Sequence, residues 1–155
     1  MKKADTFDII LYKNKTLMSK VQRFFTFSDY DHVAMLIKTS TNNIFLLEAT
    51  SSAGVAIYAL ESLLGINVHK YYVRMGYRQY KGDRNDEELY QLQEFLKEAV
   101  GKRYKFDPMY LIKNEAKKEE TYFCSELVAA CLQKAGIMRN THQPYKFLPS
   151  IFLLI

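Results

Sequence analysis

A cysteine stands at the start of the helix predicted for YFCSELVAACLQKAG, residues 122–136. A thiol in the first turn of a helix ionises more readily than one elsewhere, because the helix dipole stabilises the thiolate. Cys124 is therefore a candidate nucleophile. The competing interpretation makes Cys124 the first core residue of an apolar stripe at helical spacing, since cysteine is among the most buried residue types. Cys131, in the middle of the same stripe, is expected to be a core residue.

A histidine and a glutamate are candidates for the base that deprotonates this thiol and for the group that orients the base. His32 begins the predicted strand HVAMLIK, and Glu48 lies near the end of the next strand, NIFLLEA. A turn centred on Ser40 or Thr41 pairs residues whose numbers sum to about 80 or 82, which puts both side chains on one face of the hairpin. A carboxylate at that range can orient the imidazole and favour its protonated form. Base, orienting group and nucleophile are the components of covalent cysteine catalysis.

Taken singly, the same residues have ordinary structural interpretations. An odd register sum would put His32 and Glu48 on opposite faces of the sheet. His32 would then be a strand-edge histidine held by a backbone carbonyl, and Glu48 a partly exposed strand end near Lys38 or another cation. His69 and His142 have no acidic neighbour at a useful spacing and are expected at the surface, so no metal site and no cofactor are predicted.

Periodicity and turn signals predict the elements that position these residues. Runs of β-forming residues indicate strands, and apolar residues three and four apart indicate helices. The expected strands cover residues 7–13, 32–38, 43–49, 54–60 and 68–75, the last as a further member of the same meander. The expected helices cover residues 17–25, the stretch from an Asn85–Glu88 capping box to Gly101, and residues 124–135. Strands in the first half and helices in the second predict an α+β fold.

Length and composition limit the class of protein. With 155 residues, 48% hydrophobic and 25% charged, the chain is expected to form a single globular domain, residues 1–155. The net charge of +5 is scattered, with no long basic tract and no zinc-finger spacing, so no nucleic-acid partner is expected. No apolar segment marks a secretory signal or could span a bilayer. Two cysteines seven positions apart on one helix lie beyond disulfide reach, which predicts free thiols and a cytoplasmic location.

The chain resembles the permuted papain-like hydrolases of the NlpC superfamily, the YiiX and YaeF type. The resemblance follows, in order, FDIILYK, TFSDYDHVAMLI, LLEATSSAGVAIYAL, GKRYKFD, YFCSELVAACLQKAG and KFLPSIF. In this branch the histidine precedes the acidic residue and the cysteine helix. The resemblance implies a catalytic Cys124, a base at His32, Glu48 as third member, and a small β-barrel or curled sheet packed on the cysteine helix. A poxvirus branch is similar in size and motif order, and lecithin retinol acyltransferase-like enzymes, which form thioesters with lipids, share a related layout.

The resemblance also draws attention to Tyr104 in GKRYKFD, which falls where the family carries an aromatic residue near the thiol. Its hydroxyl could stabilise a developing oxyanion, or its ring could pack beneath the cysteine helix; both interpretations stay open. Tyr122 is a weaker candidate for the same role. Backbone N–H groups at the helix start, including that of Cys124, are natural oxyanion donors in either case.

The resulting hypothesis is a cysteine hydrolase, amidase-, peptidase- or esterase-like, that works through a thioester acyl-enzyme. If an amine or alcohol resolves the thioester, the enzyme is an acyltransferase. The expected substrate is a small molecule, peptide or lipid with an amide or ester bond, and the oligomeric state is left open. One alternative is a non-catalytic ligand-binding module of the same fold. Another is peripheral membrane contact through the apolar tail FLPSIFLLI, which could equally be the last core element.

Overall fold

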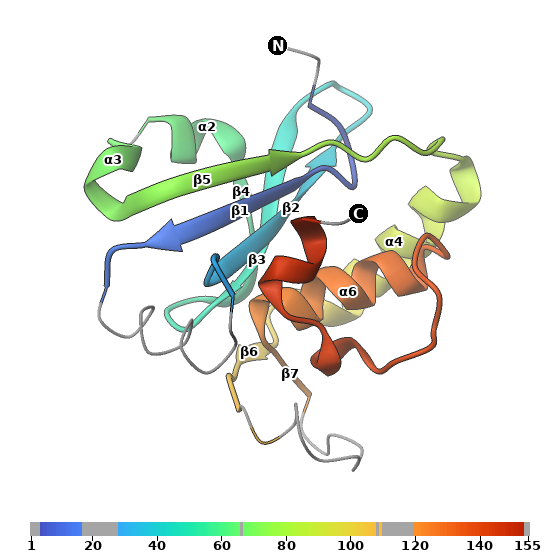
Figure 1. Cartoon of the computed structure of the whole chain (residues 1–155). Coiled ribbons are helices and arrows are strands. Elements are labelled where there is room, and N and C mark those ends of the chain that lie inside the picture. Colours follow the sequence, from blue (N-terminus) through green and yellow to red (C-terminus); the bar gives the residue numbers. More distant parts are fainter. Residues whose placement is uncertain (1–3, 17–27, 66, 108, 110–119, 154–155) are drawn as a thin grey trace. The chain divides into compact units, whose positions relative to one another are not determined.

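The computed structural model describes residues 4–16, 28–65, 67–107, 109 and 120–153, and it confirms the α+β class (Figure 1). A five-stranded open sheet has the order β4-β3-β2-β1-β5, and a two-stranded sheet pairs β6 with β7. The described elements are β1 (Ile9–Asn14), β2 (His32–Lys38), β3 (Ile44–Thr50), β4 (Gly54–Ala59), α2 (Leu60–Leu64), α3 (Val68–Tyr71), β5 (Tyr72–Arg78), α4 (Asp86–Ala99), β6 (Arg103–Tyr104), β7 (Thr121–Tyr122), α6 (Cys124–Lys134), η1 (Pro144–Lys146) and η2 (Pro149–Leu153).

The chain divides into two compact units. Unit 1 comprises Met1–Leu47, Ile57–Lys81 and Leu148–Ile155, and unit 2 comprises Glu48–Ala56 and Gly82–Phe147. The single domain over residues 1–155 stays a prediction. The helix expected at residues 17–25 lies outside the described residues.

In unit 1, β1 lies between β2 and β5 and is antiparallel to both (Figure 1). Four consecutive residues of β1, 9–12, are buried, as expected of a strand paired on both edges and covered on both faces. One core cluster uses alternate residues of three strands, which therefore share a face of the sheet. Its buried members are Ile10, Tyr12, Ala34, Leu36 and Leu46. Leu60 and Leu63 of α2 pack against this cluster.

The β2–β3 hairpin has the even register that the sequence argument requires. Met35 pairs with Leu47 and Lys38 with Ile44, so that paired residue numbers sum to 82. The turn is closed by a hydrogen bond from the Thr39 N–H to the Asn43 carbonyl, 2.9 Å. Asn42, at φ 65°, takes the left-handed conformation that commonly ends a three-residue hairpin loop.

The prediction for residues 68–75 is wrong in two respects. Residues 68–71 form the short helix α3 instead of a strand, and the strand that follows, β5, extends to Arg78. β5 also pairs with β1 at the far side of the sheet instead of extending the meander beside β4. The helix α2, which begins where the expected strand 54–60 ends, helps to connect β4 to that distant position. Pairing of strands so far apart in sequence leaves no mark on local periodicity.

In unit 2 the two principal helices, α4 and α6, contact each other (Figure 1). The predicted capping box of α4 is confirmed. The Glu88 N–H donates to the Asn85 carboxamide oxygen at 2.8 Å, and the Asn85 N–H donates to the Glu88 carboxylate at 3.3 Å. Beyond the ends of the two helices, Gly101 and Gly136 take positive φ values of 87° and 77°, as the predicted glycine stops require.

A glycine in unit 2 permits a close backbone approach. Gly54 has φ 68°, and a β-carbon there would lie 2.3 Å from the carbonyl oxygen of Lys102. The neighbouring Val55 hydrogen-bonds this segment in both directions: its N–H donates to Lys102 at 2.8 Å, and its carbonyl accepts from Gly101 at 2.9 Å. The contact joins the start of β4 to the loop after α4.

We expect Gly54→Ala to destabilise the protein more than Gly101→Ala. Both alanines would be forced into the left-handed region, at about 1–3 kcal/mol each. Only the one at position 54 would also collide with backbone, since nothing lies within 4 Å of a β-carbon at Gly101. Free energies of unfolding from urea titrations measure the difference. Equal losses in the two variants would show that the Gly54 contact is not tight in solution.

Candidate active site

Cys124 is the first residue of α6, directly after the short strand β7. The extended Phe123, at φ −87° and ψ 158°, is the N-cap, and the first helical bond runs from the Leu127 N–H to the Phe123 carbonyl at 2.9 Å. The N–H groups of the first helical turn, including that of Cys124, have no carbonyl four residues back inside the helix. Cys124 thus lies at the positive end of a helix dipole.

The two cysteines of α6 are both free and both buried. Cys124 is 1% exposed and Cys131 is fully buried. Burial raises the pKa of the Cys131 thiol far above its ordinary value, so this thiol stays protonated. Cys131 is therefore the core residue that the sequence indicated.

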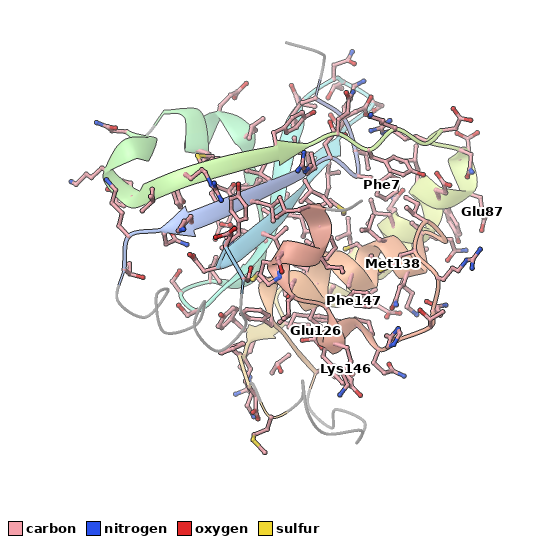
Figure 2. The ribbon with its side chains drawn as sticks, in the orientation of Figure 1. Phe7, Glu87, Glu126, Met138, Lys146 and Phe147 are labelled. Atoms are coloured by element: carbon pink, nitrogen blue, oxygen red, sulfur yellow. The ribbon has the colours of Figure 1, made fainter. Side chains whose placement is uncertain are left out.

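A buried carboxylate caps α6. Glu126, 6% exposed, accepts a hydrogen bond from the Phe123 N–H at 3.0 Å. Figure 2 shows Glu126 at the amino end of the helix. Sequence analysis missed this residue, because the glutamate of a capping box is usually recognised three residues after a serine or threonine, and here phenylalanine takes that place.

The carboxyl-terminal segment of unit 2 is attached to α6. The Ser125 hydroxyl donates to the carbonyl of Phe147 at 2.6 Å, and Figure 2 shows Phe147 beside the helix. The Gln133 side chain donates to the carbonyl of His142 at 2.8 Å. Hydrogen bonds thus connect this segment to α6 near both ends of the helix.

Tyr104 and Tyr122 lie side by side in the parallel pair β6–β7. Tyr104 pairs with a residue 18 positions later in the chain, a contact that no local signal indicates. The ring of Phe123 contacts two other rings. Its centroid lies 5.8 Å from that of Tyr104 and 4.6 Å from that of Phe106. Tyr104 therefore packs against the residue that precedes Cys124, and a role for its hydroxyl stays a prediction.

Tyr122 packs edge-on against Phe95 of α4, with ring centroids 6.0 Å apart. Burial, followed by the negative charge of Glu126, raises the pKa of the Tyr122 phenol. The hydroxyl is consequently protonated throughout the neutral range and keeps its capacity to donate a hydrogen bond.

His32, in unit 1, is the first residue of β2 and is half-buried. It pairs with Tyr12 of β1, and the two rings contact each other with centroids 5.4 Å apart. Ser28 and Asp31, in the turn before it, are buried polar residues. An imidazole so bordered by strand pairing and an aromatic ring has a restricted orientation.

Glu48 is half-buried near the end of β3. Its neighbours Leu47 and Ala49 are fully buried, so by strand alternation the carboxylate points away from the face that they occupy. Glu48 and Cys124 belong to unit 2 and His32 to unit 1. The meeting of the three side chains stays a prediction.

Two further findings concern the described residues only. They contain no group of three or more His, Cys, Asp or Glu residues arranged to hold a metal ion. They also contain no helix with the length and apolar character needed to cross a membrane. Within the apolar tail, Phe152 of η2 is fully buried, the packing expected of a last core element.

Comparisons with known proteins agree with this architecture. A family model for the permuted papain-like amidase enzymes, the YaeF/YiiX or C92 family, matches residues 5–149. The fold is similar to the crystal structure of the metalloprotein yiiX from Escherichia coli O157:H7, with a TM-score of 0.65 and 22% sequence identity over 93% of this chain and 78% of that one. At 22% sequence identity, this similarity establishes that the two proteins share a fold and nothing beyond that. No curated protein matches the sequence.

Proposed function

Because this chain belongs to the C92 family of permuted papain-like amidases, we propose that it is a cysteine-dependent hydrolase of amide bonds, with Cys124 as nucleophile, His32 as base and Glu48 as the residue that orients the base. The observation that carries the proposal is the place of Cys124 at the first position of α6, at the positive end of the helix dipole.

The proposed reaction has two stages. The His32 imidazole takes the Cys124 proton, and the thiolate attacks the carbonyl carbon of the substrate. The tetrahedral intermediate collapses to a thioester as the amine leaves with the proton from His32. Water, deprotonated by His32, then attacks the thioester and releases the acid and the free thiol.

The proposed donors for the oxyanion lie at the start of α6. The first-turn N–H groups supply them, and a tyrosine hydroxyl from the β6–β7 pair, Tyr104 or Tyr122, is a second source. The pKa of the Tyr122 phenol is raised, so this hydroxyl is protonated at neutral pH and can donate a hydrogen bond.

The substrate class proposed is a peptide or small-molecule amide, in keeping with the amidase family. Acyl transfer to an amine or alcohol, lipid ester substrates, peripheral membrane contact and a cytoplasmic location stay predictions. The similar yiiX protein is described as a metalloprotein. No metal enters the proposal for this chain.

A second candidate is a non-catalytic binding module of the same fold. The observation that favours it is the burial of Cys124, since a nucleophile must be reached by its substrate. Reactivity of the thiol in the folded protein separates the two candidates.

We expect iodoacetamide at pH 7 to alkylate Cys124 and to spare Cys131. Cys124 lies at a helix N-terminus, whereas burial raises the pKa of Cys131 and keeps that thiol protonated. Mass spectrometry of the digested protein locates the label, with Cys124→Ala and Cys131→Ala as matched controls. A Cys124 that reacts only after unfolding would favour the binding module.

A further inference from the structure

The residue before the proposed base carries a buried carboxylate. Asp31 is 3% exposed, and its two oxygens accept hydrogen bonds from the Asn14 N–H at 3.2 and 3.0 Å. The Asn14 side-chain amide also donates to the same carboxylate. The Asp31 N–H in turn donates to the carbonyl of Tyr12 at 3.0 Å. Removing a carboxylate from water is costly unless hydrogen bonds compensate it, so this arrangement holds Asp31 in one place.

The turn that contains Asp31 is fixed at its other end as well. The Ser28 hydroxyl donates to the Tyr30 carbonyl at 2.5 Å and accepts from the Tyr30 N–H at 3.2 Å. The buried Tyr30 ring lies under the Arg74 guanidinium, 4.9 Å from centroid to carbon. It also lies close to Gly76, where a β-carbon would be 3.0 Å from the Tyr30 hydroxyl oxygen. Tyr30 thus packs against β5, the strand on the other side of β1.

The same end of β1 contacts both Asp31 and His32. Asn14 holds the Asp31 carboxylate, while Tyr12, two residues earlier, pairs with His32 and contacts its ring. Any displacement of Asp31 from Asn14 would move the first residue of β2, because Asp31 and His32 are joined by one peptide bond. The carboxylate of Asp31 and the ring of His32 are thus both attached to the last residues of β1.

We propose that Asp31 is a positioning residue for His32. Its carboxylate anchors the start of β2 to the end of β1 and holds the imidazole in the orientation needed to take a proton. The consequence for reactivity rests on the proposed function, in which His32 is the base for Cys124. The effect of Asp31 on the orientation of the His32 ring does not depend on that function.

The test uses Asp31→Asn, Asn14→Asp and the double variant that exchanges the two side chains. Asp31→Asn removes the charge at almost constant shape and replaces one of the two oxygens that accept from the Asn14 N–H with an NH2 donor. Asn14→Asp sets two carboxylates against each other. In the double variant, the amide at position 31 can donate to the carboxylate at position 14, and the N–H of residue 14 keeps an acceptor.

Two measurements report the effect. Each single variant is expected to shift or broaden the His32 ring signals in ¹H–¹⁵N NMR spectra. Each is also expected to slow alkylation of Cys124 by iodoacetamide at pH 7 on the order of 10²-fold, the scale of a misplaced catalytic group. In the double variant, the His32 ring signals are expected to return close to their wild-type positions, and the alkylation rate of Cys124 is expected to recover most of its loss. A residue that serves stability alone would lower the unfolding temperature without moving the ring signals.

Asp29→Asn is the matched control. The Asp29 side chain is 71% exposed and forms surface ion pairs with Lys13 at 3.9 Å and Arg74 at 4.0 Å. Its replacement is expected to change neither measurement, because exposed pairs contribute little. His32 signals in Asp31→Asn that coincide with those of the wild type, or no recovery in the double variant, would overturn the proposal. Ring signals that move without any change in alkylation would uphold the anchoring and count against His32 as the base.

Discussion

Replacement of Cys124 by alanine is expected to abolish amide hydrolysis, with a loss in kcat on the order of 10⁶-fold, the scale observed when a nucleophile is removed from a catalytic triad. Alanine has no group that can form the thioester, so only the oxyanion donors and substrate binding remain. Release of free amine from a panel of short peptides and N-acyl amino-acid amides measures the activity. The folded state of the variant is checked by its unfolding transition.

The matched control for this variant is Cys131→Ala. Cys131 lies on the same helix and is as buried as Cys124, so the two substitutions remove the same atoms from one element. The control is expected to lower stability through the small cavity it creates and to leave kcat unchanged. Wild-type activity in Cys124→Ala would rule out the proposed mechanism whatever the behaviour of the control.

A loss of similar size is expected for His32→Gln. A base and its nucleophile act as a unit, so removal of either costs nearly as much as removal of both. Combining His32→Gln with Cys124→Ala should therefore add little to either single loss. This lack of additivity, measured as kcat on the same substrates, is the signature of a shared step and is not expected of two unrelated structural residues.

His142→Gln serves as the control for the histidine. His142 is exposed and lies within hydrogen-bond distance of Thr141, with its ring near Phe147. Its replacement should leave kcat within the range of the wild type. Strictly additive losses in the double variant of Cys124 and His32, or comparable losses in His142→Gln, would mean that the effect of His32 is not proton transfer to or from the thiol.

Features fixed by neighbouring residues could be predicted from the sequence. β2 has the predicted bounds, His32–Lys38, and α4 begins at the Asn85–Glu88 capping box. α6 begins at Cys124, as expected, so the placement of the thiol at a helix start followed from the sequence. In each case the deciding interactions join residues a few positions apart, so the periodicity or spacing of these residues can be recognised in the sequence.

Features that depend on distant pairing could not be predicted in this way. The pairing of β5 with β1, and the pair β6–β7 that holds Tyr104 beside Tyr122, join segments separated by many residues. The sequence left two roles open for Tyr104, and its ring contact with Phe123 comes from that same distant pairing. Backbone pairing of this kind is selected by the whole packed core and carries no local pattern.

His32, the first residue of β2, and Asp31, which precedes it, illustrate the difference between local and distant interactions. The sequence identified His32 by its residue type and by its position as the first residue of a predicted strand. It did not identify Asp31 as the anchor of His32, because the anchoring partner, Asn14, lies 17 positions earlier on another strand. The sequence by itself determined the types of Cys124, His32 and Glu48 and the helix or strand that carries each of them. Tertiary structure alone decided what holds them in place, because hydrogen bonds between strands depend on a register that only the assembled sheet defines.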